Sequence, residues 1–441
     1  MLITHATLAT LGSAPRLIED GALLMEGGRI KELGKTAELE ERFPGVEPWD
    51  AGGQLVLPGS ICGHTHFYGA FSRGMAIPGA PPEDFPQILQ QLWWRLDKAL
   101  TPEDVRYSAL VCLVDAVRHG TTTLIDHHAS PNAIDGSLDV IAEAVQDAGL
   151  RASLCYEVTD RDGPERARKG IEENVRFAEK AEESDRLAAS FGLHASLTLS
   201  EETLAECVKA ARAAGLGFHV HVAEGASDQE DSLEKSGKRV VHRFYDAGVL
   251  GPRTIAVHCV HVDDSEIERL AETGTWVTHQ PRSNMNNAVG VAPVERMMDA
   301  GVKMGLGNDG FSNQMFAEMK TAYFLHKLHQ RNPQALQGGR VMELAYANNS
   351  ELTKVFWPDQ QLGELTEGAM ADLVFVDYHP TTPLSADNLP WHLLFGFEAS
   401  MITSTVCAGR VLMRDRELLT LDEEAITARS RELAAEAWER L

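Results

Sequence analysis

The sequence predicts an α/β fold: a (β/α)8 barrel of the TIM type, with a small β-sandwich domain that both termini form together. Two observations lead to this prediction. Both ends of the 441-residue chain are rich in short β-like runs, and the long middle alternates apolar runs with amphipathic helical stretches. A chain of this length exceeds what one hydrophobic core usually serves, which favours a large domain with a smaller companion.

The two β-rich ends are expected at residues 1–57 and 357–441. Their strand-like runs carry apolar or alternating residues, and Gly-Gly pairs that suit tight turns separate several of them. A helix with apolar spacing closes the chain. Two such ends around a long middle fit one composite domain. The runs are Leu2 to Leu11, Gly21 to Leu33, Gln54 to Leu57, Gly363 to Tyr378 and Met401 to Leu412, and the helix spans about Asp422 to Leu441.

The middle of the chain, residues 58–356, contains about eight strand–helix units, which is the expected size of a (β/α)8 barrel. A doubly wound sheet would give the same alternation, so the residues at the strand ends must decide. The apolar runs are Leu55–Ile61, Thr121–Asp126, Arg151–Val158, Leu187–His194, Gly217–Ala223, Thr254–Val260, Thr275–His279 and Val302–Leu306.

Composition excludes several classes of protein. The formal net charge is −25, and a nucleic-acid binder would need clustered Lys and Arg instead. No apolar run approaches the ~20 residues that span a bilayer, so no membrane contact is expected. The six Cys show no C-x-x-C spacing and the N-terminus lacks a signal-peptide pattern, which together predict a cytoplasmic protein with reduced thiols.

Histidines gather at the ends of the predicted strands. Of 17 His, ten lie at or just after a strand-like run, and catalytic side chains of a barrel enzyme come from the C-terminal ends of several strands. This placement favours the barrel and marks its functional end. The ten are His64, His66, His127, His128, His194, His219, His221, His258, His261 and His279.

Four separate strand ends carry residues that suit a metal. His64 and His66 form an H-x-H pair, and residues i and i+2 of a strand point to one face. His221 follows later, then His258, then Asp309 after the last run. Imidazole and carboxylate suit Zn²⁺ or Fe²⁺, and such a set leaves room for a water.

The stretch Gly305–Gly310 matches the dinucleotide fingerprint G-x-G-x-x-G, but it lies in the last strand–helix unit instead of an early one. Its glycines are interpreted as making room around Asp309.

His64-x-His66, His221-x-x-Glu224, His258 and Asp309 resemble the amidohydrolase superfamily, in its mononuclear branch of deaminases and triazine hydrolases. More narrowly, the sequence resembles SsnA-type aminohydrolases, on three segments spread along the chain. These segments are His64 to Met75, Trp93 to Asp97 and Asp126 to Pro131.

The resemblance implies a role for each matching residue. His64, His66, His221 and Asp309 would bind the metal, His258 would stabilise the developing oxyanion, and Glu224 would be the proton shuttle. Asp309 would take the proton of a water that the cation activates, and the resulting hydroxide would attack a ring carbon. No lysine ends the fourth strand, where binuclear members carry one, so one divalent metal is expected, Zn²⁺ first and Fe²⁺ as the alternative.

Substrate contacts are expected from a further set of residues. His194 stands where deaminases contact substrate. Arg73 binds substrate or forms a salt bridge; Trp93 forms an aromatic wall or packs in the core; His279 contacts substrate or packs. One of His127 and His128 points into the pocket, or the pair marks a second metal.

The expected activity is metal-dependent hydrolytic deamination of a nitrogen heterocycle, purine-like in form. Ring-opening of a cyclic amide and dechlorination are the enzymatic alternatives, and a metal-binding protein without catalysis is the alternative of another class. A small-molecule substrate and water are the expected partners, in a homodimer that the resemblance alone implies.

Overall fold

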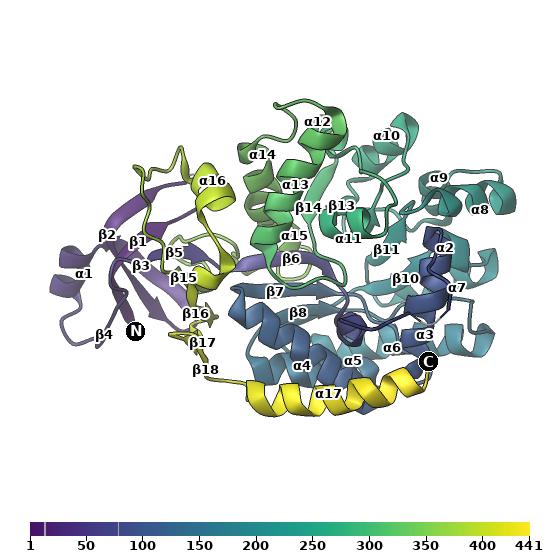
Figure 1. Ribbon diagram of the computed structural model, residues 1–441, viewed down its shortest axis with the longest axis horizontal. Helices are drawn as coiled ribbons and strands as arrows, with labels where there is room; N and C mark the ends of the chain where they lie inside the picture. Colours follow the sequence, from purple (N-terminus) through teal and green to yellow (C-terminus); the bar gives the residue numbers. More distant parts are fainter. Residues whose placement is uncertain (13–14, 78) are drawn as a thin grey trace.

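The structure is a computed structural model that describes residues 1–12, 15–77 and 79–441. Figure 1 shows a β-rich part that contains the N-terminus, beside a larger part in which helices surround strands. Within the described ranges, every helix is too short or too polar to span a bilayer.

The β-rich part is one nine-stranded sheet built from both ends of the chain. Its order is β18-β17-β16-β15-β5-β1-β2-β3, and β4 pairs with β1. The ends meet where β5 runs antiparallel to β15, with Leu55 opposite Val376 and Pro58 opposite Leu373. The strands are β1 (Leu2–Ala9), β2 (Leu17–Glu26), β3 (Arg29–Lys35), β4 (Pro48–Asp50), β5 (Leu55–Pro58), β15 (Leu373–Val376), β16 (Ile402–Cys407), β17 (Arg410–Arg414) and β18 (Glu417–Leu418).

The first predicted barrel run, Leu55–Ile61, is divided between two strands. Its first half is β5 of the β-rich sheet, and its second half begins β6 (Ser60–Thr65), the first strand of the larger part. Gly59 separates them, and a Cβ there would lie 2.2 Å from the hydroxyl of Thr122, so only glycine fits this close approach.

The larger part contains two parallel sheets, β6-β7-β8-β9 and β10-β11-β12-β13-β14. Their residues are buried almost throughout, as expected for parallel strands covered on both faces. Each of the seven later apolar runs contains a strand, so the predicted α/β alternation is confirmed. Besides β6, the strands are β7 (Thr121–Asp126), β8 (Arg151–Leu154), β9 (Leu187–Ala189), β10 (Phe191–Ala195), β11 (Phe218–Val222), β12 (Ile255–His258), β13 (Trp276–His279) and β14 (Lys303–Leu306).

The fourth predicted strand belongs to both sheets. Its first half, β9, pairs with β8, and its second half, β10, pairs with β11. The change falls at Ser190, whose N–H donates to the Leu154 carbonyl at 3.2 Å, while the next N–H, of Phe191, donates to Gly217 at 2.8 Å. One continuous run of the sequence therefore joins the two sheets.

Helices follow most strands of the larger part, and several begin with side-chain caps. Thr101 and Asp104 form a capping box at the start of α4, and Asp263 and Glu266 form another at α10. The α-helices are α1 (Thr36–Arg42), α2 (Phe85–Ile88), α3 (Trp94–Ala99), α4 (Pro102–Arg118), α5 (Ser137–Ala148), α6 (Pro164–Ala181), α7 (Glu201–Ala213), α8 (Ala226–Ser236), α9 (Val240–Ala247), α10 (Asp264–Thr273), α11 (Pro281–Asn286), α12 (Val294–Asp299), α13 (Met315–Gln330), α14 (Gly338–Met342), α15 (Asn349–Thr353), α16 (Leu389–Trp391) and α17 (Glu423–Glu439).

Short 3₁₀ and π segments complete the described chain. The 3₁₀ segments are η1 (Phe67–Ser72), η3 (Ser196–Thr198) and η6 (Ala399–Met401), and the π segments are η2 (Leu89–Trp93), η4 (Glu343–Asn348) and η5 (His392–Gly396).

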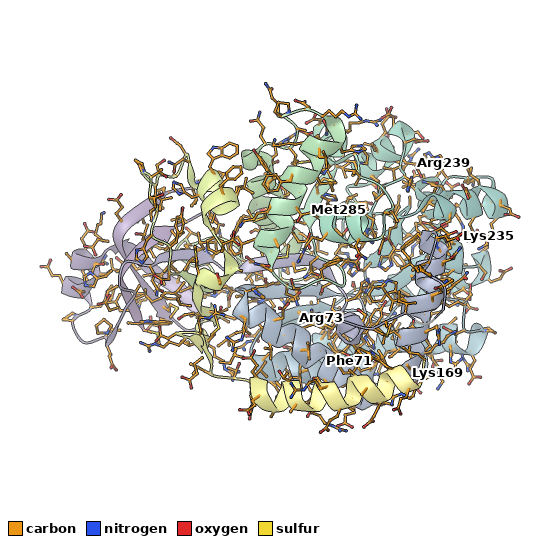
Figure 2. The ribbon with its side chains drawn as sticks, viewed as in Figure 1. Phe71, Arg73, Lys169, Lys235, Arg239 and Met285 are labelled. Atoms are coloured by element: carbon orange, nitrogen blue, oxygen red, sulfur yellow. The ribbon has the colours of Figure 1, made fainter. Side chains whose placement is uncertain are left out.

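The closing helix α17 differs from the prediction in where it packs. The sequence groups it with the small β-rich domain, but the structure lays it along α4 of the larger part (Figure 1). Its residues Ile426, Leu433 and Ala437 are buried there. The Trp438 indole donates to the carbonyl of Phe71 at 2.8 Å, and Figure 2 labels Phe71 next to this helix. An amphipathic helix packs wherever an apolar surface lies within reach, and here that surface belongs to α4.

Candidate active site

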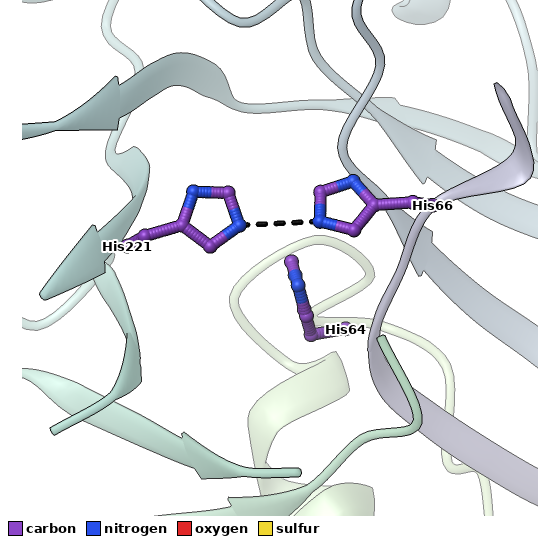
Figure 3. A group of neighbouring side chains, drawn as sticks. All are labelled: His64, His66 and His221. Atoms are coloured by element: carbon purple, nitrogen blue, oxygen red, sulfur yellow. Dashed lines mark hydrogen bonds between the residues drawn. The ribbon is translucent and has the colours of Figure 1, made fainter. Parts of the chain in front are cut away.

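The ends of four strands bring five side chains to one place. His64 lies in β6 and His66 directly follows it, His221 lies in β11, His258 ends β12, and Asp309 comes three residues after β14. Figure 3 shows the rings of His64, His66 and His221 turned toward one another. The five predicted residues therefore meet, although nearly 250 positions separate the first from the last.

The Asp309 carboxylate lies among these imidazoles. Its Oδ1 is 3.2 Å from Nε2 of His66 and 3.7 Å from Nε2 of His64, and its Oδ2 is 3.7 Å from Nε2 of His258. Nε2 of His66 is also 3.2 Å from Nε2 of His221. The inward atoms are thus all potential metal ligands.

The outer nitrogens of three histidines fix which nitrogen carries the hydrogen. Nδ1 of His66 lies 2.6 Å from the carbonyl of His127, and Nδ1 of His221 lies 2.8 Å from the carbonyl of His194. Nδ1 of His258 lies 2.8 Å from Oδ1 of Asn284. A carbonyl oxygen only accepts, so each Nδ1 donates and each Nε2 presents a lone pair inward.

A longer chain of contacts orients His64. The Cys155 thiol donates to the Asp126 carbonyl at 3.6 Å, so its sulfur accepts from Nδ1 of His219 at 3.7 Å. Nε2 of His219 then accepts from Nδ1 of His64 at 2.8 Å. His64 Nε2 is left with an inward lone pair, buried and without a hydrogen-bond partner.

These observations fit a divalent cation. Ligand atoms of His64, His66 and His221 lie within 4.8 Å of one another, as do those of His64, His258 and Asp309. Several lone pairs around one carboxylate repel each other unless a cation or a proton lies between them. A set of imidazole nitrogens and one carboxylate suits Zn²⁺ or Fe²⁺.

The backbone is strained at two of these residues. His258 has a φ of 73° and Asp309 a φ of 59°, in the left-handed region that side-chain-bearing residues rarely adopt. Ala223, directly before Glu224, has a φ of 48°. Strain of this kind costs about 1–3 kcal/mol per residue and gathers at functional sites.

Gly307 explains part of the glycine-rich stretch before Asp309. A Cβ on Gly307 would lie 2.7 Å from the backbone nitrogen of His64 and 2.8 Å from its carbonyl oxygen. The loop after β14 therefore presses against β6, and the amides of Asn308 and Asp309 donate to the His64 carbonyl at 2.9 and 3.1 Å. This contact agrees with the interpretation that the glycines make room around Asp309.

Charges reinforce one another at the centre of the site. Burial raises the pKa of Asp309, but the neighbouring imidazoles of His64 and His66 outweigh burial and hold the pKa well below its usual range. Burial lowers the pKa of His66, but the Asp309 carboxylate outweighs burial and raises the pKa to about 9, so a proton lies on Nε2 of His66 when no cation occupies the cluster. Asp309 is therefore a fixed negative charge at the point where the lone pairs meet.

Glu224 lies at the edge of this cluster, and burial raises its pKa to about 6. Its Oε2 is 3.3 Å from Nε2 of His258, and its Oε1 accepts from the amide of Asn287 at 3.3 Å. A carboxyl with a pKa near neutrality can both take up and release a proton at working pH.

One short element, α11 with the residue after it, holds three of the site residues. Ser283 donates to Oδ2 of Asp309 at 2.5 Å, Asn284 accepts from His258, and Asn287 donates to Glu224. The sequence analysis did not single out these residues. Polar side chains at helical spacing, directly after a strand that ends in His, are the signal that could have found them.

Two of the six expected substrate contacts line the pocket at this site. His194 and Trp93 lie on its wall, together with Tyr68, Trp94 and Phe85. Burial lowers the pKa of His194 to about 4, so its ring is neutral at pH 7. Phe85, Trp93 and Trp94 come from the continuous segment α2, η2 and α3, and Tyr68 comes from η1, so these segments form an aromatic side of the pocket.

Four expected contacts point elsewhere within the described chain. Arg73 (labelled in Figure 2) lies outside the lining and 3.9 Å from Asp115, as its salt-bridge alternative implies. His128 contacts Ser130 at 2.8 Å and His279 lies 3.2 Å from His326, each in the buried interior. His127 is buried behind the lining, so neither residue of the pair lines the pocket. The three histidines end or directly follow strands and Arg73 follows η1, but packing turns all four side chains away.

Glu157 is a further lining residue that the sequence analysis missed. It follows β8 by three residues, is 3% exposed, and lies 3.4 Å from Nδ1 of His127 and from Arg161. Burial raises its pKa, but the basic groups around the carboxylate, His194, His127 and Arg161, outweigh burial and hold the pKa below its usual range. A charged residue inside the apolar run Arg151–Val158 was the available signal.

Comparison with known proteins identifies related sequences. A model of the amidohydrolase family matches residues 55–412, and one of an imidazolonepropionase-like composite domain of bacteria matches residues 21–45. The 5'-deoxyadenosine deaminase of Methanosarcina mazei is 33% identical over 443 residues, covering 99% of this chain and 98% of the relative. The 5-methylthioadenosine/S-adenosylhomocysteine deaminase of Haloarcula marismortui is 36% identical over 405 residues and covers 90% of each chain.

Solved structures resemble the fold along nearly the whole chain. An adenosine deaminase from Xanthomonas campestris, solved with bound zinc, superposes with a TM-score of 0.86 at 24% identity. The match covers 99% of this chain and 98% of that one. Similarity of this extent without high identity shows a shared fold.

Proposed function

The chain belongs to the amidohydrolase family, and we propose that it is a metal-dependent deaminase that hydrolytically removes an amino group from a purine-like heterocycle. It is a hydrolase that acts on carbon–nitrogen bonds. The observation that carries the proposal is Glu224, a carboxyl with a pKa of about 6, placed 3.3 Å from His258 beside the ligand cluster.

We also propose that the larger part is a closed (β/α)8 barrel. Two contacts support closure: the fourth strand joins the two parallel sheets on one side, and a parallel bridge between Thr65 and Asp309 links their other edges. For the nine-stranded sheet we propose a sandwich, a proposal that the stacking of Trp49 of β4 on Phe375 of β15, at 4.4 Å between ring centroids, supports. The division at residues 57/58 and 356/357 remains a prediction.

The proposed metal ligands are His64, His66, His221 and Asp309. Their inward lone pairs and the single carboxylate favour one cation, with Zn²⁺ as the first choice and Fe²⁺ as the alternative. When bound, such a cation is a Lewis acid that makes hydroxide available at neutral pH.

The chain's own residues move the protons. Asp309 takes the proton of the attacking water, because its carboxylate stays ionised within the cluster. His258 faces both Asp309 and Glu224 through Nε2. When this nitrogen carries a proton, the imidazolium stabilises the oxygen that becomes negative at the attacked carbon. Glu224 gives its proton to the neighbouring ring nitrogen. The amino group takes the proton held by Asp309 and leaves as ammonia, and Glu224 recovers a proton from the new hydroxyl group as the carbonyl forms.

Ammonia release tests the proposed function. The zinc-loaded protein is assayed with 5'-deoxyadenosine, 5'-methylthioadenosine, S-adenosylhomocysteine, adenosine and guanine. Free ammonia with an intact ring supports the proposal. A new carboxylate would show ring-opening, chloride release from a chlorinated triazine would show dechlorination, and absence of turnover with every compound would contradict an enzymatic role.

The homodimer remains a prediction. Sedimentation of the zinc-loaded protein checks it, because a dimer has twice the mass of the 48.3 kDa chain.

A further inference from the structure

Glu157 lines the pocket but takes no part in the proposed reaction. Two backbone bridges hold it in place, since its neighbour Tyr156 pairs with His128 and its other neighbour Val158 pairs with Leu193. Its own N–H donates to the carbonyl of His128 at 2.8 Å. The side chain therefore projects from a rigid wall, and not from a mobile loop.

The two carboxylate oxygens of Glu157 face different neighbours. Oε2 is 3.4 Å from Nδ1 of His127, while Oε1 is 3.4 Å from the Arg161 guanidinium and 3.9 Å from Nε2 of His194. Arg161 also pairs with Asp97 and Asp162, which are 1% and 3% exposed, so its charge is divided among three buried carboxylates. Glu157 keeps spare capacity to accept hydrogen bonds.

His127 does not form a hydrogen bond to the Glu157 carboxylate. Nε2 of His127 lies 3.1 Å from the carbonyls of Leu193 and His219, so this nitrogen carries a hydrogen. In the neutral ring, Nδ1 then presents a lone pair toward Glu157, and Nδ1 has no hydrogen-bond partner.

His194 presents a lone pair to the part of the pocket beside Glu157. The Thr198 hydroxyl donates to the Ala195 carbonyl at 3.2 Å, so it accepts from Nδ1 of His194 at 2.7 Å. Nε2 of His194 is then an acceptor on the pocket wall, next to Glu157. The wall beside these two residues offers acceptors, whereas Glu224 lies at another part of the pocket beside His258.

We propose that Glu157 and His194 form an acceptor-only subsite that selects substrates presenting hydrogen-bond donors to this wall. The donors are N–H groups of the heterocycle or hydroxyl groups of an attached sugar. A ligand edge that carries only lone pairs would leave a buried, ionised carboxylate facing acceptors, which weakens binding. The inference rests on the proposed function for the assignment of this pocket to the substrate.

Deaminated products test the subsite without turnover. Affinities of the zinc-loaded protein are measured by calorimetry for two ligand pairs. Inosine against 2',3'-dideoxyinosine tests sugar hydroxyls, and hypoxanthine against 9-methylhypoxanthine tests a ring N–H. In at least one pair the ligand with more donors should bind about 10- to 100-fold more tightly, the range expected for hydrogen bonds to a charged acceptor. The pair that responds identifies the source of the donors.

Glu157→Gln removes the charge and keeps the shape. Its amide can donate to the free Nδ1 of His127, so the wall should remain intact, and the ratio within the responsive pair should fall below about threefold. Glu172→Gln, at an exposed position of α6, is the matched control and should leave the ratio unchanged.

Equal affinities within both pairs, including failure of all four ligands to bind, would overturn the proposal. A ratio that persists in Glu157→Gln would overturn it as well. The ammonia assay fails separately: donor-dependent binding without ammonia release contradicts only the deaminase, and ammonia release with donor-independent binding contradicts only the subsite.

Discussion

Hydrogen-bond acceptors on the side away from the proposed metal orient the histidine side chains of the site. His66 and His221 each donate to a backbone carbonyl, and His64 is held through His219. Such contacts fix the tautomer and direct the other nitrogen inward. A substitution behind a ligand should therefore weaken the metal site without removing a ligand.

Glu224→Gln should keep the metal and lose most of the turnover. Glutamine has the same shape but cannot transfer a proton, and a positioned acid or base is typically worth ~10²–10⁴-fold in rate. Steady-state kinetics with metal analysis of the same samples checks this. Glu234→Gln, at an exposed position of α8, is the control, and full activity in Glu224→Gln would remove Glu224 from the mechanism.

His219→Phe should lower metal affinity even though His219 is not a proposed ligand. Loss of the acceptor for Nδ1 of His64 frees the ring to rotate, and mutations behind metal ligands typically cost ~10–100-fold in affinity. Competition with a zinc chelator measures the change. His242→Phe, at a helix position on the surface side, should have wild-type affinity.

At the scale of elements, the short helix α11 and the residue after it contact three site residues. Ser283, Asn284 and Asn287 contact Asp309, His258 and Glu224 within one and a half turns of chain. The strand before α11 supplies no proposed metal ligand, so this segment contributes by holding others. The segment therefore fixes the positions of Asp309, His258 and Glu224 through hydrogen bonds.

Asn287→Ala should reduce kcat and shift its pH dependence, while metal content stays at the wild-type level. The Asn287 amide lowers the pKa of Glu224 by donating to its carboxylate. Without this donor the pKa of Glu224 rises above about 6, and the limb of the pH–rate profile that reports Glu224 moves to higher pH. If that limb of the pH–rate profile does not move, the hydrogen bond from Asn287 does not control the pKa of Glu224. Met285→Ala, at an exposed position of α11, is the control.

The helix α17 should stabilise the larger part of the molecule. Leu433→Ala deletes a side chain that is 2% exposed, which typically costs about 2–5 kcal/mol in the free energy of unfolding. Denaturation monitored by circular dichroism measures it. Glu436→Ala, on the exposed side of the same helix, should change stability by less than about 0.5 kcal/mol.

At the scale of the whole molecule, a buried ion pair joins the β-rich sheet to a parallel strand of the larger part. Arg151 begins β8 and Asp372 directly precedes β15, and their side chains lie 2.6 Å apart at 0% and 3% exposure. Asp372 also accepts from the amide of Ala408 at 2.7 Å. The pair fixes how the two parts sit against each other.

Arg151→Met should destabilise the protein by about 3–5 kcal/mol, because it leaves the Asp372 carboxylate buried without its cation. Chemical denaturation checks the shift of the midpoint. Arg340→Met breaks an ion pair whose Asp299 partner is 70% exposed, and it should cost less than about 1 kcal/mol. Equal effects of the two substitutions would show that the buried pair adds nothing.

The contribution of Asp228 to stability should fall as pH rises from about 4 to about 7. Burial raises the pKa of Asp228 to about 7, so the folded state holds this proton more tightly than the unfolded state. The contribution is complete below the unfolded pKa of about 4 and is lost through about 7, with a slope of at most ~1.4 kcal/mol per pH unit. Thermal unfolding between pH 4 and 8 should show a flatter slope in Asp228→Asn. An identical slope would exclude Asp228 as its source.

The sequence alone predicted the α/β alternation and the residues that converge at the site. A strand that is buried on both faces appears in the sequence as an apolar run, so a polar residue at its end is easily recognised. His64, His66, His221, His258 and Asp309 were found in this way because each lies at or near a strand end. The strand period of two further explains why His64 and His66 face one space.

Only the tertiary structure decided which neighbouring side chains face the pocket. Arg73, His128 and His279 carry the same sequence signal as true lining residues, yet Asp115, Ser130 and His326 hold them elsewhere. Glu157 lies inside an apolar run, and only the structure shows that it lines the pocket. The helix α17 packs on α4 and not on the sheet that precedes it in sequence. These outcomes depend on contacts between residues far apart in the chain, and local periodicity carries no information about such contacts.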